Sequence, residues 1–531
     1  MRRQVFVNGR IFTGKSEEDF VTALSLVDGT VDWIGDEKKL SPASRSIAYD
    51  LGGRTVLPGF LDMHVHPTLM AALTDDVEVL PEQIRSIDAL VETLRTHRAL
   101  GLSSDDWITG SGYDETRFVD GASPVAADLD RVSVEQPVMI WRADRHSSVC
   151  NTRALEIAGI TAQTPDPPGA RFERDAEGNP NGILTEREAT QAVSIAIPQR
   201  SLEERVRQLR AIGKRLLSKG IVGVCDMMAT AMSSPLEAYR RAYSRGPFPR
   251  SGLFYGWDPD EPLADLREDE RDGSARVAGV KVLMDGTYTN RTAWVCDPYP
   301  DSCDQGMRTI TDEDLRSAAD WARRNRVQLA VHAMGDKAIN HVVDILGGRD
   351  PWLSSRPSVR IEHATIMAPD LVARLVSSPM SFGIATHSIF LFAEYEAYAK
   401  NLRPGLMPDA YPLRRLYGEI EPLALSSDCP ATSWGDADNP FVSIQAAVTR
   451  RAHTGADIGF ASALTVSQAI LLYTARAAEL TEIDGLGQLA PGRRGSFIVL
   501  DRDVFSIPSD EISQICIDET WVDGNLVHHR E

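Results

Sequence analysis

Apolar residues in the middle of the chain alternate between helical and strand-like spacing. Ser201 and Glu204 form a capping box, and the apolar positions that follow recur at helical spacing up to Gly220. The next run, residues 221–225, is continuously apolar and predicts a buried strand. Repeated units of this kind predict a parallel sheet, and their number favours a closed (β/α)8 TIM-like barrel over an open sheet. Further apolar elements occur at 315–322, 327–331, 359–361, 371–375, 382–385 and 423–425.

Both ends of the chain carry the pattern of short β-hairpins. Near the N-terminus, β-forming residues flank Asn8-Gly9 and Asp28-Gly29, and near the C-terminus they flank Asp523-Gly524. Chain ends often lie close together in folded domains, so both ends are predicted to share one domain. The predicted domains are a small β-sandwich from residues 1–56 and 489–531, and a barrel from residues 57–488.

More residues separate the first two predicted barrel strands than one βα unit needs. The excess, about residues 70–200, contains the turn-rich stretch Thr164–Gly182, which is expected to be a loop. We interpret this insertion as a cap over the mouth of the barrel. The charged stretch Glu261–Arg276 is expected to be a solvated surface loop.

The composition excludes several classes of protein. The 531 residues include 76 acidic and 56 basic side chains, and the net charge of −20 disfavours nucleic acid as a partner. No apolar run is long enough to span a bilayer, and no signal-peptide core follows the N-terminus, so a cytoplasmic protein without a membrane partner is expected. The six cysteines contain no CxxC motif. Cys296 and Cys303 could pair in principle, but free thiols are expected.

Histidines and one aspartate fall at the carboxyl ends of predicted strands. His64 and His66 lie two residues apart, so their imidazoles would project from the same side of a strand as a pair of metal ligands. His332 and His363 each end a later strand, and Asp428 ends another. Barrel active sites lie at this end of the strands, so these residues predict a metal site there.

Two charged residues lie within or beside these strands. Lys281 interrupts an otherwise apolar strand, where an unpaired ammonium is costly to bury. Two explanations stay open: an ion pair with Asp285, or reaction of the desolvated amine with carbon dioxide to give a carbamate that bridges two metal ions. Glu362 is expected to face the other side of its strand from His363, in a structural role.

Longer motifs around these residues resemble the metal-dependent amidohydrolase superfamily, in the branch that includes N-substituted formamide deformylases. The resemblance spans essentially the whole chain. It is carried by LPGFLDMHVH at 57–66, VKVLMDGT at 280–287, HAMGDKA at 332–338, IEHA at 361–364 and SSDCP at 426–430.

The resemblance implies a role for each of these positions. One or two divalent metal ions, with zinc the expected metal, would be bound by His64, His66, Lys281 as carboxylysine, His332 and His363. Asp428 would be the catalytic acid and base. Substrate-side roles are implied for Trp107, Tyr113, Asp114, His146 and His387.

The expected function is hydrolysis of an amide or related C–N bond of an N-acyl or N-formyl amine. A metal-activated hydroxide would attack, with Asp428 as general base and then acid. Two alternatives stay open: an ester or lactone hydrolase that uses the same site, and an inactive barrel that serves as a binding or scaffold protein. The expected partner is a small-molecule substrate, and a homodimer is the candidate assembly.

Overall fold

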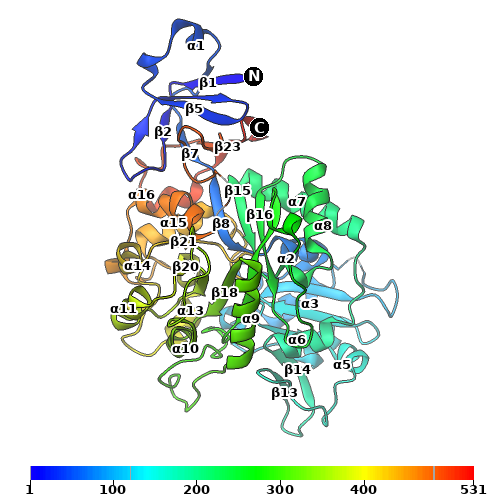
Figure 1. The fold of residues 1–531 in the computed structure, drawn as a ribbon. Coiled ribbons are helices and arrows are strands. Elements are labelled where there is room, and N and C mark those ends of the chain that lie inside the picture. Colours follow the sequence, from blue (N-terminus) through cyan, green and yellow to red (C-terminus); the bar gives the residue numbers. More distant parts are fainter. Residues whose placement is uncertain (1, 98, 120, 482, 484) are drawn as a thin grey trace.

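A ring of parallel strands forms the centre of the protein (Figure 1). The computed structural model describes residues 2–97, 99–119, 121–481, 483 and 485–531. Two backbone hydrogen bonds close the ring: the Asp428 N–H donates to the His64 carbonyl at 2.8 Å, and the His66 N–H donates to the Cys429 carbonyl at 2.9 Å. The predicted TIM-like barrel is therefore confirmed. Its strands, in order around the sheet, are β8 (Phe60–Val65), β15 (Ile221–Asp226), β16 (Arg250–Gly256), β17 (Ala275–Leu283), β18 (Gln328–Ala333), β19 (Val359–His363), β20 (Phe382–Thr386) and β21 (Leu423–Leu425).

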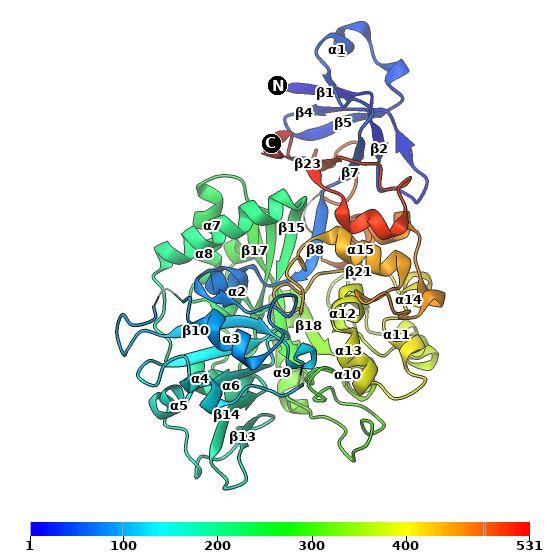
Figure 2. The same cartoon turned by 180° about the vertical axis from the view of Figure 1, so that it is seen from behind.

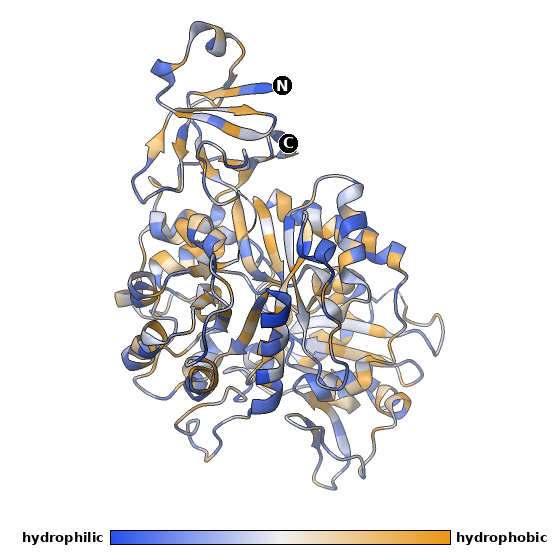
Figure 3. Cartoon of the chain, viewed as in Figure 1, coloured by the Kyte–Doolittle hydropathy of each residue, from blue (hydrophilic) through white to orange (hydrophobic). Residues whose placement is uncertain are grey.

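Helices cover the outside of the ring, because each has an apolar face for the strands and a polar face for water. The predicted capping box of Ser201 and Glu204 starts α7 (Leu202–Ser218). The barrel strands are coloured as hydrophobic in Figure 3, whereas α9 on the outside is largely hydrophilic. The other helices of this part are α2 (Pro67–Ala72), α8 (Pro235–Ser244), α9 (Asp312–Asn325), α10 (Asp336–Leu346), α11 (Pro369–Ser377), α12 (Ser388–Ala393), α13 (Tyr395–Asn401), α14 (Leu413–Glu419), α15 (Pro440–Thr449), α16 (Val466–Leu471) and α17 (Ala475–Leu480).

Both chain ends lie in a β-sandwich at the amino-terminal end of the barrel strands (Figures 1 and 2). Its two sheets enclose a cluster of buried side chains that includes Phe6, Leu24, Phe497 and Trp521. One sheet contains β5 (Thr30–Gly35), β4 (Ala23–Val27), β1 (Arg3–Val7) and β6 (Tyr49–Asp50), next to the short helix α1 (Pro42–Ser46). The other contains β24 (Asn525–His529), β23 (Ile517–Val522), β22 (Phe497–Leu500), β7 (Thr55–Pro58), β2 (Arg10–Phe12) and β3 (Phe20–Val21).

The segment between α2 and α7 folds as a separate sheet with its own helices. It lies at the opposite end of the barrel from the β-sandwich (Figure 1). Because this is the end where the strands terminate, the segment covers the barrel mouth. Its strands, in sheet order, are β13 (Arg171–Arg174), β14 (Pro180–Thr185), β12 (Ser147–Cys150), β11 (Val138–Arg142), β10 (Ile108–Tyr113) and β9 (Val77–Glu78), and its helices are α3 (Ile87–Leu94), α4 (Ala126–Asp130), α5 (Thr152–Ala158) and α6 (Arg187–Ser194).

Three local expectations need correction. The stretch Thr164–Gly182 is not all loop: it contains β13 and the start of β14, because Phe172 is buried against the cap and Gly178 allows the tight turn at a φ of +86°. The stretch Glu261–Arg276 ends inside β17. Strand β16 was not predicted, since glycines dilute its apolar run.

Two further expectations concern cysteines and membranes. Cys296 and Cys303 are exposed and free, as expected. Within the described residues, no helix has the length and the apolar character that a membrane crossing requires.

Candidate metal centre

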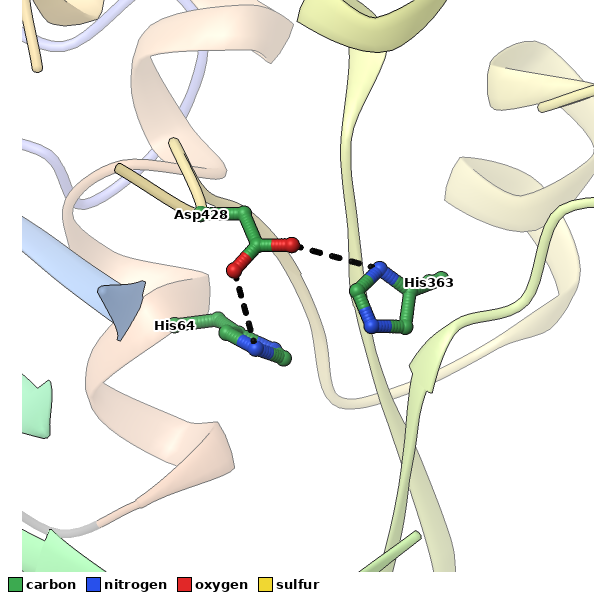
Figure 4. Close-up of side chains that lie close together, drawn as sticks. All are labelled: His64, His363 and Asp428. Carbon is green, nitrogen blue, oxygen red and sulfur yellow. Dashed lines mark ion pairs between the residues drawn. The ribbon is translucent and has the colours of Figure 1, made fainter. Parts of the chain in front are cut away.

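The ends of β8, β19 and β21 bring two histidines and an aspartate together (Figure 4). The Nε2 atom of His64 lies 3.3 Å from Oδ1 of Asp428, and Nδ1 of His363 lies 3.7 Å from Oδ2 of the same carboxylate. All three side chains are buried. One ligand atom from each lies within 4.8 Å of the others, a spacing at which all three could contact one ion.

The other predicted ligands surround this trio. The Nε2 atom of His66 lies 2.8 Å from Oδ1 of Asp428. The rings of His332 and His363 lie 4.4 Å apart. The Nζ atom of Lys281 is buried in the wall of the same cavity and has no hydrogen-bond partner among the described residues. The structure therefore gathers all six predicted residues at one point.

Neighbouring groups orient the first two histidines. Burial lowers the pKa of His64 well below its usual value, so its ring is neutral. Its Nδ1 lies 2.6 Å from the Glu362 carboxylate, which can accept a hydrogen bond from it. Nδ1 of His66 lies 2.7 Å from the carbonyl of Met227. With its ring proton on Nδ1, the neutral His64 presents the lone pair of Nε2 to the Asp428 carboxylate.

A bound cation would stabilise nitrogen and carboxylate lone pairs that point toward one another in this way. Nδ1 of His363 and Nζ of Lys281 are likewise buried without a hydrogen-bond partner among the described residues. Burial lowers the pKa values of His332 and His363 well below the usual range, and that of Lys281 to about 8. Metals bind neutral imidazoles, so these residues fit a metal site.

The backbone at two of these strand ends is strained. His363 has a φ of +69° and Asp428 has a φ of +55°, in the left-handed region that residues with a Cβ atom disfavour. Such conformations cost free energy and cluster at functional sites. Here they turn both side chains from the strands into the cavity.

The structure corrects one expectation about a neighbouring acid and decides one open question. Glu362 was expected to face the other side of its strand from His363, away from the site, yet it points into the barrel interior and contacts His64, because the site lies directly above that interior. Asp285 does not pair with Lys281. Its carboxylate accepts the backbone N–H groups of Trp294, Met334 and Gly335 instead.

Two of the five expected substrate-side residues, His146 and His387, lie at or beside the cavity. His146 lines the cavity, whose volume is about 190 Å³, and its ring lies 5.0 Å from that of His332. Burial opposes charge on His146, but Glu186 at 2.7 Å outweighs this effect and raises the pKa of His146 to about 9. His387 lies behind the wall, with its ring 4.7 Å from that of His363.

Trp107, Tyr113 and Asp114 do not line this cavity. Trp107 packs in a hydrophobic cluster of the cap, Tyr113 lines a separate polar pocket, and Asp114 lies 3.2 Å from the guanidinium of Arg142. The cap also supplies Arg145, from the segment around His146 that resembles the substrate side of the family, together with Asp144 and Arg187, which the sequence reasoning missed.

A barrel with this set of residues at its strand ends is that of a metal-dependent hydrolase. A model described as "Amidohydrolase family" matches residues 48–528, and the chain belongs to that family, which makes it a hydrolase that acts on C–N bonds. The chain is 26% identical to the N-substituted formamide deformylase of Arthrobacter pascens over 100% of this chain and 99% of that one. It is 27% identical to the YtcJ protein of Bacillus subtilis (strain 168), over 99% and 100% of the two chains.

Solved structures show the same fold. An uncharacterized metal-dependent hydrolase from Pyrococcus horikoshii OT3 superposes with a TM-score of 0.73 at 23% identity, over 96% of this chain and 99% of that one.

Proposed function

We propose that this protein hydrolyses the amide bond of an N-acyl or N-formyl amine. The observation that carries the proposal is the position of the Asp428 carboxylate, 2.8 Å from His66 and 3.3 Å from His64 at the wall of a cavity of about 190 Å³. The likeness to a formamide deformylase over the full length of both chains supports this substrate class.

One or two divalent ions, zinc in our proposal, would be held by His64, His66, Lys281, His332 and His363. Such an ion lowers the pKa of water and polarises a carbonyl oxygen. The buried amine of Lys281 has no hydrogen-bond partner in the part of the chain that the structure describes. The side-chain ammonium would first lose a proton, and the neutral amine would then add to carbon dioxide with loss of a second proton, which gives an anionic carbamate ligand.

Asp428 would move the proton of the reaction. Its Oδ2 atom makes no hydrogen bond among the described residues, so it is free to take a proton from the attacking water and pass it to the leaving nitrogen. His146, kept protonated by Glu186, would donate a hydrogen bond to the substrate.

Metal analysis by mass spectrometry, combined with a substrate screen, tests the proposal. Purified protein should contain stoichiometric divalent metal and hydrolyse members of a panel of N-formyl and N-acyl amines. Turnover confined to the matched esters would instead favour the ester hydrolase alternative. Protein without stoichiometric metal and without turnover on any substrate would favour the scaffold alternative.

A further inference from the structure

An arginine occupies an unfavourable backbone position in the turn between β11 and β12. Arg145 has a φ of +63°, and its N–H donates to the carbonyl of Arg142 at 3.0 Å. Glycine adopts this left-handed conformation without strain, whereas a residue with a Cβ atom does not. A strained arginine in a cavity wall points to a function for its side chain.

The Arg145 guanidinium makes no hydrogen bond or ion pair with another residue that the structure describes. Its Nη1 atom is buried and makes no hydrogen bond among the described residues, although the guanidinium stacks on Trp141 at 5.1 Å. Burial lowers the pKa of Arg145 to about 10, so the group stays charged at neutral pH. An unpaired charge in such surroundings is costly unless a ligand supplies the counterion.

The two carboxylates whose charges act on Arg145, those of Asp144 and Asp76, are held by other groups. Asp144 accepts from Arg142 at 2.6 Å and from Thr289 at 2.9 Å. Asp76 accepts from the hydroxyl of Thr109 at 2.6 Å, and burial raises the pKa of Asp76 to about 6. Among the described residues, neither acid lies within ion-pair distance of Arg145.

A second arginine lines the same cavity. Arg187 is the first residue of α6, and no ion pair joins it to another described residue. The acidic cavity residue Glu394 does not neutralise the two arginines, because burial raises its pKa to about 8. Apolar side chains complete the wall, among them Leu69, Leu283 and Phe390.

We propose that Arg145, assisted by Arg187, binds a carboxylate of the substrate. The preferred substrates are then N-acyl or N-formyl amines that carry both a carboxylate and an apolar group, as an N-acylated apolar amino acid does. An arginine fork suits a carboxylate because it donates two parallel hydrogen bonds. This inference rests on the proposed function, since it names the substrate class of the same site.

The test compares two ligands that differ by one carboxylate and that the enzyme cannot hydrolyse. The N-methylsulfonyl derivatives of phenylalanine, as both enantiomers, and of 2-phenylethylamine have these properties. Their dissociation constants are measured by calorimetry on the metal-loaded protein. We expect at least one phenylalanine derivative to bind about 10- to 100-fold more tightly than the phenylethylamine derivative.

The substitution Arg145→Gly removes the guanidinium and relieves the backbone, so it should leave the thermal midpoint unchanged or raise it. The preference for the carboxylate should disappear in this variant and weaken in Arg187→Gln. A matched control is Arg326→Gly, which replaces an exposed arginine with a φ of +55° at the end of α9 and should keep the preference.

Equal binding of the ligands by the wild type, absence of binding by the carboxylates, or a preference that survives Arg145→Gly would overturn the inference. Turnover is scored separately, on the N-formyl derivatives of the same two amines. Absence of a carboxylate preference in the wild type, with its turnover intact, rejects the inference alone. Carboxylate binding without hydrolysis of any amide rejects the proposed function.

Discussion

The Nδ1 atom of His64 lies 2.6 Å from Oε2 of Glu362, and both side chains are buried in the barrel. The guanidinium of Arg360 holds the same carboxylate from the other side, at 2.9 and 3.0 Å. Arg360 also donates to the carbonyl of Met63 at 2.7 Å, next to His64 in the chain. A buried charged pair therefore supports the candidate metal centre from below, and loss of one partner would leave a charge without compensation.

The substitution Glu362→Gln should weaken metal binding by about 10- to 100-fold, because the amide no longer fixes the ring of His64 as a carboxylate does. The thermal midpoint should fall as well, since Arg360 loses its counterion. Metal titration and calorimetry measure the two effects. Glu396→Gln, which changes a partly exposed glutamate 3.2 Å from His453, is the control and should alter neither. Unchanged metal affinity in Glu362→Gln would contradict the supporting role.

The substitution Asp428→Asn should keep the metal but reduce kcat by about 100- to 10,000-fold, because the amide cannot accept and return a proton. Metal content by mass spectrometry and turnover on the best amide substrate measure this. A variant that turns over at the wild-type rate would exclude Asp428 as the acid and base.

The substitution Lys281→Ala should lose both metal and turnover, because it removes the nitrogen that carries the proposed carbamate. Wild-type protein reconstituted in carbonate-free buffer should also load metal poorly, and added bicarbonate should restore loading in the wild type but not in the variant. Full metal occupancy in Lys281→Ala would rule out the bridging role.

Glu394 predicts a dependence of stability on pH. Burial, reinforced by Asp114 and Asp144, raises its pKa from 4.5 to about 8. The folded state then binds this proton more tightly than the unfolded state, so the contribution of Glu394 to stability is greatest below pH 4.5 and falls as the pH rises toward 8. Glu394→Gln cannot ionise, and its advantage over the wild type should grow by up to roughly 1.4 kcal/mol per pH unit in that range.

Thermal midpoints of the wild type and of Glu394→Gln, taken between pH 4.5 and 8, measure how the stability difference between them depends on pH. Glu177→Gln, in an exposed turn of the cap, is the control, and its difference from the wild type should not vary with pH. A constant difference for Glu394→Gln as well would show that Glu394 titrates normally.

The sequence alone determined the architecture of the barrel and the position of its ligand-type residues along the strands. The capping box at Ser201 and the apolar run of β15 are local patterns, and hydrophobic periodicity reports such patterns directly. For the same reason, His64, His332 and His363 were recognisable at strand ends before any contact between them was known. The missed strand β16 marks the limit of this reasoning, since its glycines weaken the periodicity.

The tertiary structure alone decided which side chains meet. Closure of the barrel places Glu362 against His64, which lies 298 positions away in the chain. Packing of the cap on the barrel brings Arg145 into the cavity and leaves Trp107 outside it. The physical reason is that periodicity assigns a residue to a face of its own element, whereas contacts between elements depend on how strands close and domains dock, over separations that no local pattern encodes.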